Sequence, residues 1–419
     1  MKLKYNIEDR LPMGQMIIYA LQWFILAVAV VVTSVFVAQG SPAEKLFYSQ
    51  KLFAVMGITG LVQVLWGHKM PFVVGPAAVL LVGVLSSLGA GASTDAIYSS
   101  IAIGGALVVL LSLGGIMRKI QRLFTPRIVV VILMLIAFTL TPVIKGLVFP
   151  PQAHGGEHIF GLVFTIVGCL GMVIMNRTLK GVAKSLVIPI ALVVGSVAYY
   201  ALFPMQERVT AASNLGSLVI GEFSLDWGLI IAFVICYIAL LINDIGSMES
   251  LGAMLKVDGM DRRLKRGVRI TGVMNIVAGG MGVLGPVNYS MSPGVIASTG
   301  CVSRRVMIPA TVALILCALF PDVVWALTNI PNPVIGVILL FLMGTQLSAG
   351  FEMLHTTNAV RNFSEALTIS LPLMVAMLFQ LMPKGIVPSV IEPLVGNGFA
   401  MGVVTVMLME HVVNRNKSL

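Results

Sequence analysis

The sequence is dominated by runs of about 20 apolar residues, separated by short breaks that contain basic residues, glycine or proline. Hydrophobic residues make up 58% of the 419 positions and charged residues only 11%, with a mean hydropathy of +0.99. A soluble domain would carry about 25% charged residues. The runs therefore exclude a water-soluble globule and predict an all-α polytopic membrane protein.

Windows of this length predict fourteen membrane spans. The first run is longer than the core of a signal peptide and no small-residue cleavage site follows it, so we expect it to remain in the mature chain. The predicted spans lie near 14–38, 46–66, 71–91, 97–117, 125–146, 159–176, 183–203, 225–248, 267–285, 289–301, 305–327, 333–351, 365–382 and 396–413.

The distribution of basic residues predicts the orientation. With the N-terminus inside, most of the 27 lysines and arginines fall in cytoplasmic segments, above all 256–269 and 118–127. The positive-inside rule then places both termini in the cytoplasm and the chain in a cell membrane, most simply a prokaryotic cytoplasmic membrane. The net charge of +10 reflects this asymmetry. Basic and aromatic residues do not interleave, so we expect a lipid bilayer and no nucleic acid as the partner.

Two predicted spans are interrupted at corresponding places. The third begins MPFVVGPAAV, with Gly75 and Pro76, and the tenth begins NYSMSPGVIA, with Pro293 and Gly294. Each is the third span of a seven-span half, and an odd number of spans per half inverts one half relative to the other. Such paired interruptions indicate a midplane binding site in inverted-repeat transporters. An extended stretch followed by a half-helix would present N–H groups to a carbonyl or anionic edge. The alternative is two proline kinks relieved by neighbouring helices.

Two of the 17 acidic residues, Asp244 and Glu249, do not fall clearly in loops or at span ends. They lie in LLINDIGSMESLGAML, on the eighth span and its continuation. An ionisable group in the membrane costs at least about 2.5 kcal/mol, so it usually serves transport. Both are candidates for proton coupling. Alternatively, the span ends near residue 243 and both lie at the wet interface. Asn243 is either a site residue or an interhelical hydrogen-bonding residue.

The cysteines and histidines predict no metal site. The four cysteines lack paired spacing, and the five histidines form no HExxH or similar pattern. We also find no convergent nucleophile, base or metal set of the kind an enzyme needs. We therefore expect no metal, no cofactor other than a coupling ion, and no enzymatic activity.

Several motifs occur in a fixed order along the chain. The stretch LKRGVRITGVMNIVAGGMGVLGPVNYSMSPGVIASTGCVSRRV resembles a ninth span R-G-L-x-x-D-G-x-x-T-x-x-A-G-x-x-G followed by a tenth ending V-G-x-x-x-x-T-G-x-x-S-R. These are motifs of the nucleobase/ascorbate transporter family, also called nucleobase-cation symporter family 2. The family's twelfth-span element is similar to IPNPVIGVILLFLMG, and the start of its fifth span is similar to RLFTPRIVVVILMLIAFTLTP. Its first-span Gln-His resembles Gln22-Trp23, and its third-span Gly-Pro-Ser element resembles residues 75–78.

The side-chain anchors of that family are altered here. Its eighth span carries E-x-x-G-D, whose Glu holds the base, and the spacing from Arg266-Gly267 puts Asn243 at the Glu and Ser247 at the Asp. A second register would put Glu249 at the Glu. Met291 and Ser292 stand at the tenth-span Gln/Glu-Asn pair. Asparagine cannot titrate and methionine is a weak acceptor, so Asp244 would carry any proton coupling.

The resemblance implies two inverted seven-span repeats that form a core (spans 1–4 and 8–11; segments 1–117 and 220–327) and a gate (spans 5–7 and 12–14; segments 118–210 and 328–414), in a homodimer. It implies a nucleobase solute, uracil or xanthine first, driven by protons or sodium in a core-against-gate elevator motion. A carrier of a small organic or inorganic anion, or a non-transporting member, are the alternatives. The candidate site is Gly75, Pro76, Ala77, Asn243, Asp244, Ser290, Met291 and Ser292, with Gln22 and Ser247 as further candidates.

Overall fold

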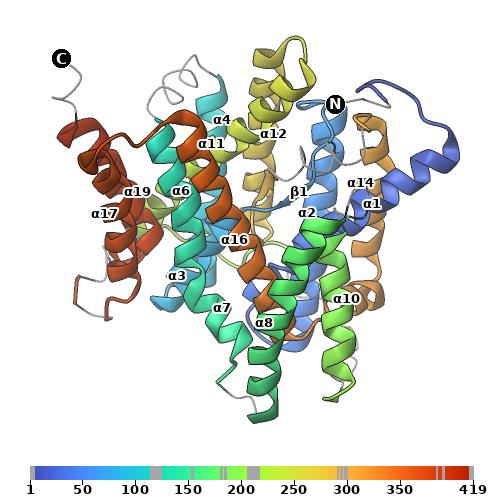
Figure 1. The fold of residues 1–419 in the computed structure, drawn as a ribbon, viewed down its shortest axis with the longest axis horizontal. Helices are drawn as coiled ribbons and strands as arrows, with labels where there is room; N and C mark the ends of the chain where they lie inside the picture. The colour runs from blue at the N-terminus through green and yellow to red at the C-terminus, as the bar shows by residue number, and fades with distance from the viewer. Residues whose placement is uncertain are drawn as a thin grey trace.

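The computed structural model is a helical bundle with one small sheet near its centre (Figure 1). It describes residues 5–113, 125–151, 155–179, 183, 186–204, 218–289, 292, 296, 301–383, 386–388 and 392–414. The first half contains α1 (Met13–Val32), α2 (Pro42–Leu65), β1 (Val74–Pro76), α3 (Ala78–Gly89), α4 (Thr94–Leu113), α6 (Pro126–Thr139), α7 (Thr141–Val148), α8 (Gly155–Thr178) and α10 (Val187–Tyr200).

The second half repeats this order. It contains α11 (Trp227–Leu255), α12 (Met260–Gly280), β2 (Pro286–Asn288), α14 (Met307–Leu319), α15 (Pro321–Thr328), α16 (Asn332–Thr357), α17 (Phe363–Gln380), α18 (Glu392–Val395) and α19 (Gly398–Leu408).

Local sequence explains where several helices begin. Ser41 caps α2 by accepting from the Glu44 backbone N–H, while the Glu44 carboxylate accepts from the Ser41 N–H, which completes a capping box. Thr125 caps α6 in the same manner, and each of these helices has proline at its first position. Asn397 caps α19.

Within the described residues, seven helices are long and apolar enough to cross a membrane, or eight if α14 and α15 form one bent span. The number of fourteen spans therefore stays a prediction. Two predicted spans are not single straight helices. The fifth divides at Leu140 because Pro142 begins a new helix, and the eleventh bends by 105° before Pro321. The eighth is longer than predicted, because α11 continues without a break to Leu255.

The helix contacts occur in matched pairs. Helix α4 packs on α12 as α14 packs on α2, α11 packs on α4 as α1 packs on α14, and α11 packs on α19 as α1 packs on α10. In each case the second contact is obtained from the first by replacing every helix with its counterpart in the other half. The contact of α16 with α8 likewise corresponds to the contact of α6 with α17. The packing is therefore that of two related halves.

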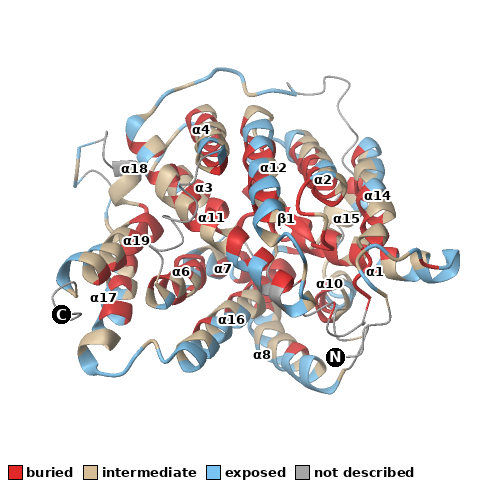
Figure 2. Cartoon of the chain, turned by 90° about the horizontal axis from the view of Figure 1, so that it is seen from above, coloured by how far each residue is buried: buried red, intermediate tan, exposed pale blue. Residues whose placement is uncertain are grey.

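Every residue of β1 and β2 is buried, and Figure 2 shows β1 in red among the helices. Helix α8 is largely exposed, and most of the side chains it exposes before its last turn are apolar, which is the surface that a lipid-facing helix needs. The sheet thus lies inside the bundle, where water cannot hydrogen-bond its backbone.

Helices α4 and α12 approach so closely that only glycine fits at their contact. A Cβ on Gly279 would lie 2.4 Å from the Ala102 nitrogen and 2.6 Å from the Tyr98 carbonyl oxygen. A Cβ on Gly105 would lie 2.6 Å from the Ile276 nitrogen. Small residues at such crossings let helix backbones pack directly in a membrane.

Gly279→Ala should therefore destabilise the protein. The methyl group would meet backbone atoms of α4 that cannot move independently, so we expect the free energy of unfolding to fall by about 1–3 kcal/mol. The measurement is thermal unfolding of the detergent-purified protein. Gly280→Ala is the matched control, because a Cβ there would meet no atom within 4 Å. Equal melting temperatures for the two variants would contradict this account of the helix crossing.

Candidate functional site

The centre of the candidate site is an antiparallel pair of short strands, one from each half. Val74 pairs with Asn288, Gly75 with Val287 and Pro76 with Pro286. Backbone bonds extend the pairing at both ends, from the Tyr289 N–H to Val73 O and from the Ala77 N–H to Gly285 O, both at 2.9 Å. The extended stretch predicted at Gly75-Pro76 is confirmed. In the second half the strand precedes the predicted tenth span, and Pro293 and Gly294 lie outside the described residues.

Helix α3 is the half-helix predicted after the first strand. Its N-cap residue is Ala77, and no side chain of the described residues caps it. The first N–H groups of a helix have no partner inside the helix and lie at the positive end of its dipole. This start is buried inside the bundle, where a carbonyl or anionic group of a bound molecule could accept from it.

Gly75 brings three elements together. A Cβ at this position would lie 2.4 Å from Val30 Cγ1 of α1 and 2.8 Å from Cε2 of the Tyr289 ring. The Tyr289 hydroxyl in turn donates to Pro76 O at 2.7 Å. Only glycine therefore allows α1, β1 and the residue after β2 to pack this closely.

Asp244 is fully buried on α11 and joins that helix to β2 and α12. Its Oδ1 accepts from the Asn288 backbone N–H at 3.2 Å and from Asn288 Nδ2 at 2.8 Å. Its Oδ2 accepts from Thr271 Oγ1 at 2.9 Å. Three donors around one carboxylate offset the cost of burying its charge. The alternative that Asp244 lies at a wet interface is wrong, because its side chain is fully buried on a helix that continues to Leu255.

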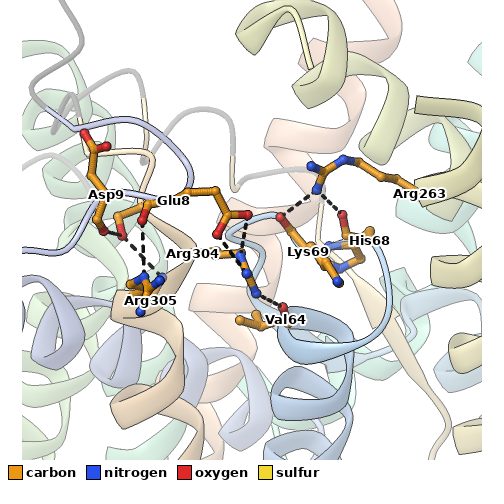
Figure 3. Close-up of polar contacts among 9 residues, drawn as sticks. Glu8, Asp9, Val64, His68, Lys69, Arg263, Arg304 and Arg305 are labelled. Carbon is orange, nitrogen blue, oxygen red and sulfur yellow. Dashed lines mark hydrogen bonds and ion pairs between the residues drawn. The ribbon is translucent and has the colours of Figure 1, made fainter. Parts of the chain in front are cut away.

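The hydrogen-bond network continues beyond Asn288 to His68, in the link between α2 and β1. His68 Nδ1 accepts from the Met70 N–H at 3.0 Å, so its Nε2 must carry the hydrogen and donates to Asn288 Oδ1 at 3.2 Å. Burial lowers the pKa of His68 to about 4, which keeps the ring neutral near neutral pH. Figure 3 shows Arg263 donating to the carbonyl oxygens of His68 and Lys69.

On the other side of Asp244 the network continues to α2. Gln63 Nε2 donates to Thr271 Oγ1 at 3.1 Å and to Gly267 O at 2.9 Å. Asn275, one turn after Thr271, donates to Pro286 O and accepts from the Tyr237 hydroxyl. The Asn275 amide of α12 thus holds both β2 and α11.

The structure brings only some of the predicted residues together. Gly75, Pro76 and Ala77 lie in or beside the strand pair, and the buried Ser292 hydroxyl accepts from the Val73 N–H next to it. Asn243 is half-buried, and the Ser247 hydroxyl donates a hydrogen bond to the Asn243 backbone carbonyl.

The remaining predicted site residues are Gln22, Glu249, Ser290 and Met291. Gln22 is buried on α1, two turns before Val30. Glu249 is exposed near the end of α11. Ser290 and Met291 lie outside the described residues.

Six residues of the network were not predicted: Gln63, His68, Tyr237, Thr271, Asn275 and Asn288. Thr271 carried a signal, because aligning Arg266-Gly267 and Gly272 on the ninth-span motif puts it at the motif's aspartate. The others are single polar residues inside or next to apolar runs, and nothing in the local sequence distinguishes them from other polar positions of membrane helices and loops.

The N-terminal segment 5–9 packs against the residues that precede α14. Its Tyr5 and Ile7 carbonyls accept from the Val302 and Arg304 N–H groups. Arg304 also forms a bidentate ion pair with Glu8 at 2.9 and 2.8 Å, which lowers the pKa of that carboxyl (Figure 3). The segment between β2 and α14 is thereby tied to the start of the chain.

A separate apolar groove of about 380 Å³ lies between α11 and α19. Apart from His411, its lining has no group that could recognise a polar ligand, and it does not include the strand pair. Its lining residues are Ile235, Ile238, Val403, Val404, Met407, Leu408 and His411.

Comparison with known proteins gives consistent results. Residues 14–385 match the Permease family (Xan_ur_permease). The xanthine permease XanP of Escherichia coli K12 is 24% identical, over 97% of this chain and 94% of XanP. The nucleobase transporter PlUacP of Paenibacillus larvae is 24% identical, over 90% of this chain and 89% of PlUacP. The transmembrane domain of the cyanobacterial bicarbonate transporter BicA has the same fold, with a TM-score of 0.65 at 12% identity over 97% of this chain and 99% of that domain.

Asn288→Leu should destabilise the protein, because it leaves the His68 N–H without its acceptor and removes one donor from Asp244. Buried groups left unpaired in this way should lower the free energy of unfolding by about 2–3 kcal/mol. Thermal unfolding in detergent measures the effect. Asn329→Leu is the control, since that half-buried amide makes a single side-chain bond, to Tyr200. An Asn288→Leu variant no less stable than the control would contradict the network.

Proposed function

This chain belongs to the Permease family, and we propose that it carries a nucleobase, xanthine or uracil first, across a cell membrane by proton symport. Membership makes it a multi-pass membrane transporter rather than an enzyme. The observation that carries the proposal is the length of the match, which includes both strands and Asp244. The relatives that cover 90% or more of this chain include a xanthine permease and a nucleobase transporter.

The region around the strand pair suits a neutral, planar, polar solute. The uncapped start of α3 offers N–H donors to the carbonyl groups of a base. Asn243, half-buried on α11 at the position of the family's base-binding Glu, can both donate and accept. A base presents alternating donors and acceptors at its edge, so an amide there supports recognition without a charge.

Proton coupling is favoured over sodium coupling by the contacts of Asp244. Both carboxylate oxygens accept hydrogen bonds from protein donors, so a cation at this position would meet N–H and O–H hydrogens rather than oxygen ligands. A proton needs only a lone pair of the carboxylate and no set of oxygen ligands.

We propose that segments 1–117 and 220–327 form a core that moves against a gate formed by 118–210 and 328–414, within a homodimer whose chain ends are cytoplasmic. The matched helix contacts between the two halves support this division. A same-fold anion carrier is not favoured, because the likeness to the bicarbonate transporter is one of fold at 12% identity. The altered side-chain anchors would also fit a non-transporting member, but that alternative is not favoured, because the relatives that match most of this chain are permeases and transporters.

The direct test is uptake of radiolabelled xanthine, uracil and hypoxanthine into cells that lack their own base permeases. We expect saturable uptake of at least one base and its loss when a protonophore removes the proton gradient. Cells carrying the empty vector are the control, with surface-labelled protein measured in parallel. Correctly inserted protein that takes up none of the bases would contradict the proposed solute.

Asp244→Asn should abolish pH-driven accumulation and spare exchange of labelled for unlabelled base. An asparagine cannot take up a proton, yet its oxygen can accept from Asn288 and its amide can donate to Thr271, so the packing of α11, β2 and α12 is kept. Accumulation is measured at external pH 5.5 to 8 and exchange at equal pH on both sides. Unchanged pH-driven accumulation would rule out Asp244 as the proton carrier.

A further inference from the structure

The two oxygens of Asp244 have partners of different kinds. The partners of Oδ1 are the backbone N–H and the Nδ2 group of Asn288. The partner of Oδ2 is the Thr271 hydroxyl. N–H groups can only donate, whereas a hydroxyl can donate or accept. The two sides of the carboxylate therefore differ in their ability to tolerate an added proton.

The Oδ1 side is fixed in one hydrogen-bonding state. Asn288 cannot rotate its amide to offer an oxygen to Asp244, because its Oδ1 accepts from His68 Nε2. His68 cannot exchange its donor for an acceptor, because its Nδ1 accepts from the Met70 N–H. A hydrogen on Asp244 Oδ1 would thus face two donors and have no acceptor.

The Oδ2 side can change state. The Thr271 oxygen already accepts from Gln63 Nε2, which leaves it one further lone pair for a donor. Its own hydrogen can turn toward the Gly267 carbonyl, four residues earlier on α12, because threonine hydroxyls in helices commonly donate to the carbonyl at that position and share it with the backbone N–H. Gln63 Nε2 contacts both Gly267 O and Thr271 Oγ1 and so holds the two groups close together.

We propose that Thr271 is the positioning residue for proton coupling, and that the proton binds at Oδ2 of Asp244. This inference rests on the proposed proton symport. In the ionised state the Thr271 hydroxyl donates to Oδ2. On loading, a hydronium ion gives one proton to Oδ2, an O–H bond forms, and a water molecule is released. The new O–H donates to Thr271, whose hydrogen turns to Gly267 O; unloading reverses each step.

Other titratable groups around Asp244 do not compete for this role. His68 reaches Asp244 only through the Asn288 amide and is neutral. Tyr237 of α11 donates to Asn275, and Arg263 of α12 donates to the carbonyls of His68 and Lys69. The charged groups on the described parts of the other packed elements lie elsewhere: Glu249, Arg266 and Arg269 are exposed, Asp95 accepts from the Glu222 N–H, and Glu410 pairs with Arg127.

The test is the pH dependence of base uptake by Thr271→Val. The hydroxyl makes a charge-assisted bond to the ionised carboxylate, which is stronger than its bond to the acid, so its removal favours the protonated form. We expect the pH midpoint of uptake to move upward by about one pH unit, a tenfold change in proton affinity. Thr271→Ser keeps the hydroxyl and should restore the wild-type midpoint.

A matched control is Thr59→Val. Thr59 is a buried threonine of α2 whose hydroxyl donates only to the Val55 carbonyl, so its loss should leave the midpoint unchanged. A merely structural role for Thr271 would lower the uptake rate without moving the midpoint. A wild-type midpoint in Thr271→Val would overturn the proposal.

A second measurement does not depend on transport. Infrared difference spectra of the purified protein, recorded between pH 5 and 8, should show the C=O band of one protonated carboxyl that is absent in Asp244→Asn. In Thr271→Val the band should move to higher frequency, because the acid hydrogen has lost its acceptor. An unshifted band would contradict the role of Thr271, even if the protein carried no base. Absence of base uptake with a shifted band would instead count against the proposed solute.

Discussion

Extended backbone inside a membrane protein must find hydrogen-bond partners within the protein, because lipid offers none. The strands β1 and β2 meet this constraint by pairing with each other, and each comes from a different half of the chain. Neither half could bury its strand alone. Side chains complete the pairing at its ends: Ser292 accepts from Val73, Tyr289 donates to Pro76, and Asn275 donates to Pro286. The surrounding helices are positioned by this requirement.

The helices and the first strand could be predicted from local sequence because their causes are local. An apolar run of sufficient length forms a helix in a membrane, and adjacent Gly75 and Pro76 prevent one. The buried position of Asp244 could also be predicted, since a carboxylate inside an apolar run has few other places to lie. The break at Leu140 and the bend before Pro321 were missed, although each has a proline at the start of the following helix.

The partners of Asp244 could not be predicted, because they lie far away in the sequence. Thr271 is 27 residues from it and Asn288 is 44, while His68 reaches Asn288 across 220 residues. Which polar residues meet depends on how α2, α11 and α12 cross, and periodicity carries no information about that crossing. The second proton-coupling candidate shows the same limit: Glu249 is one turn beyond Asp244, yet it is exposed.

The arrangement separates charge from solute recognition. Where the ninth-span motif has an aspartate this chain has Thr271, and where the eighth-span motif has a glutamate it has Asn243. A carboxylate nevertheless remains where α11 meets α12, because Asp244 extends from α11 to the Thr271 hydroxyl of α12. The proposed proton cannot contact a base directly, since Asp244 is fully buried. Its effect would pass through Thr271, which joins α12 to Oδ2 and changes state, while Asn288 keeps β2 on Oδ1 in both states. Coupling in this chain would therefore run through the contact between α11 and α12 beside the strand pair.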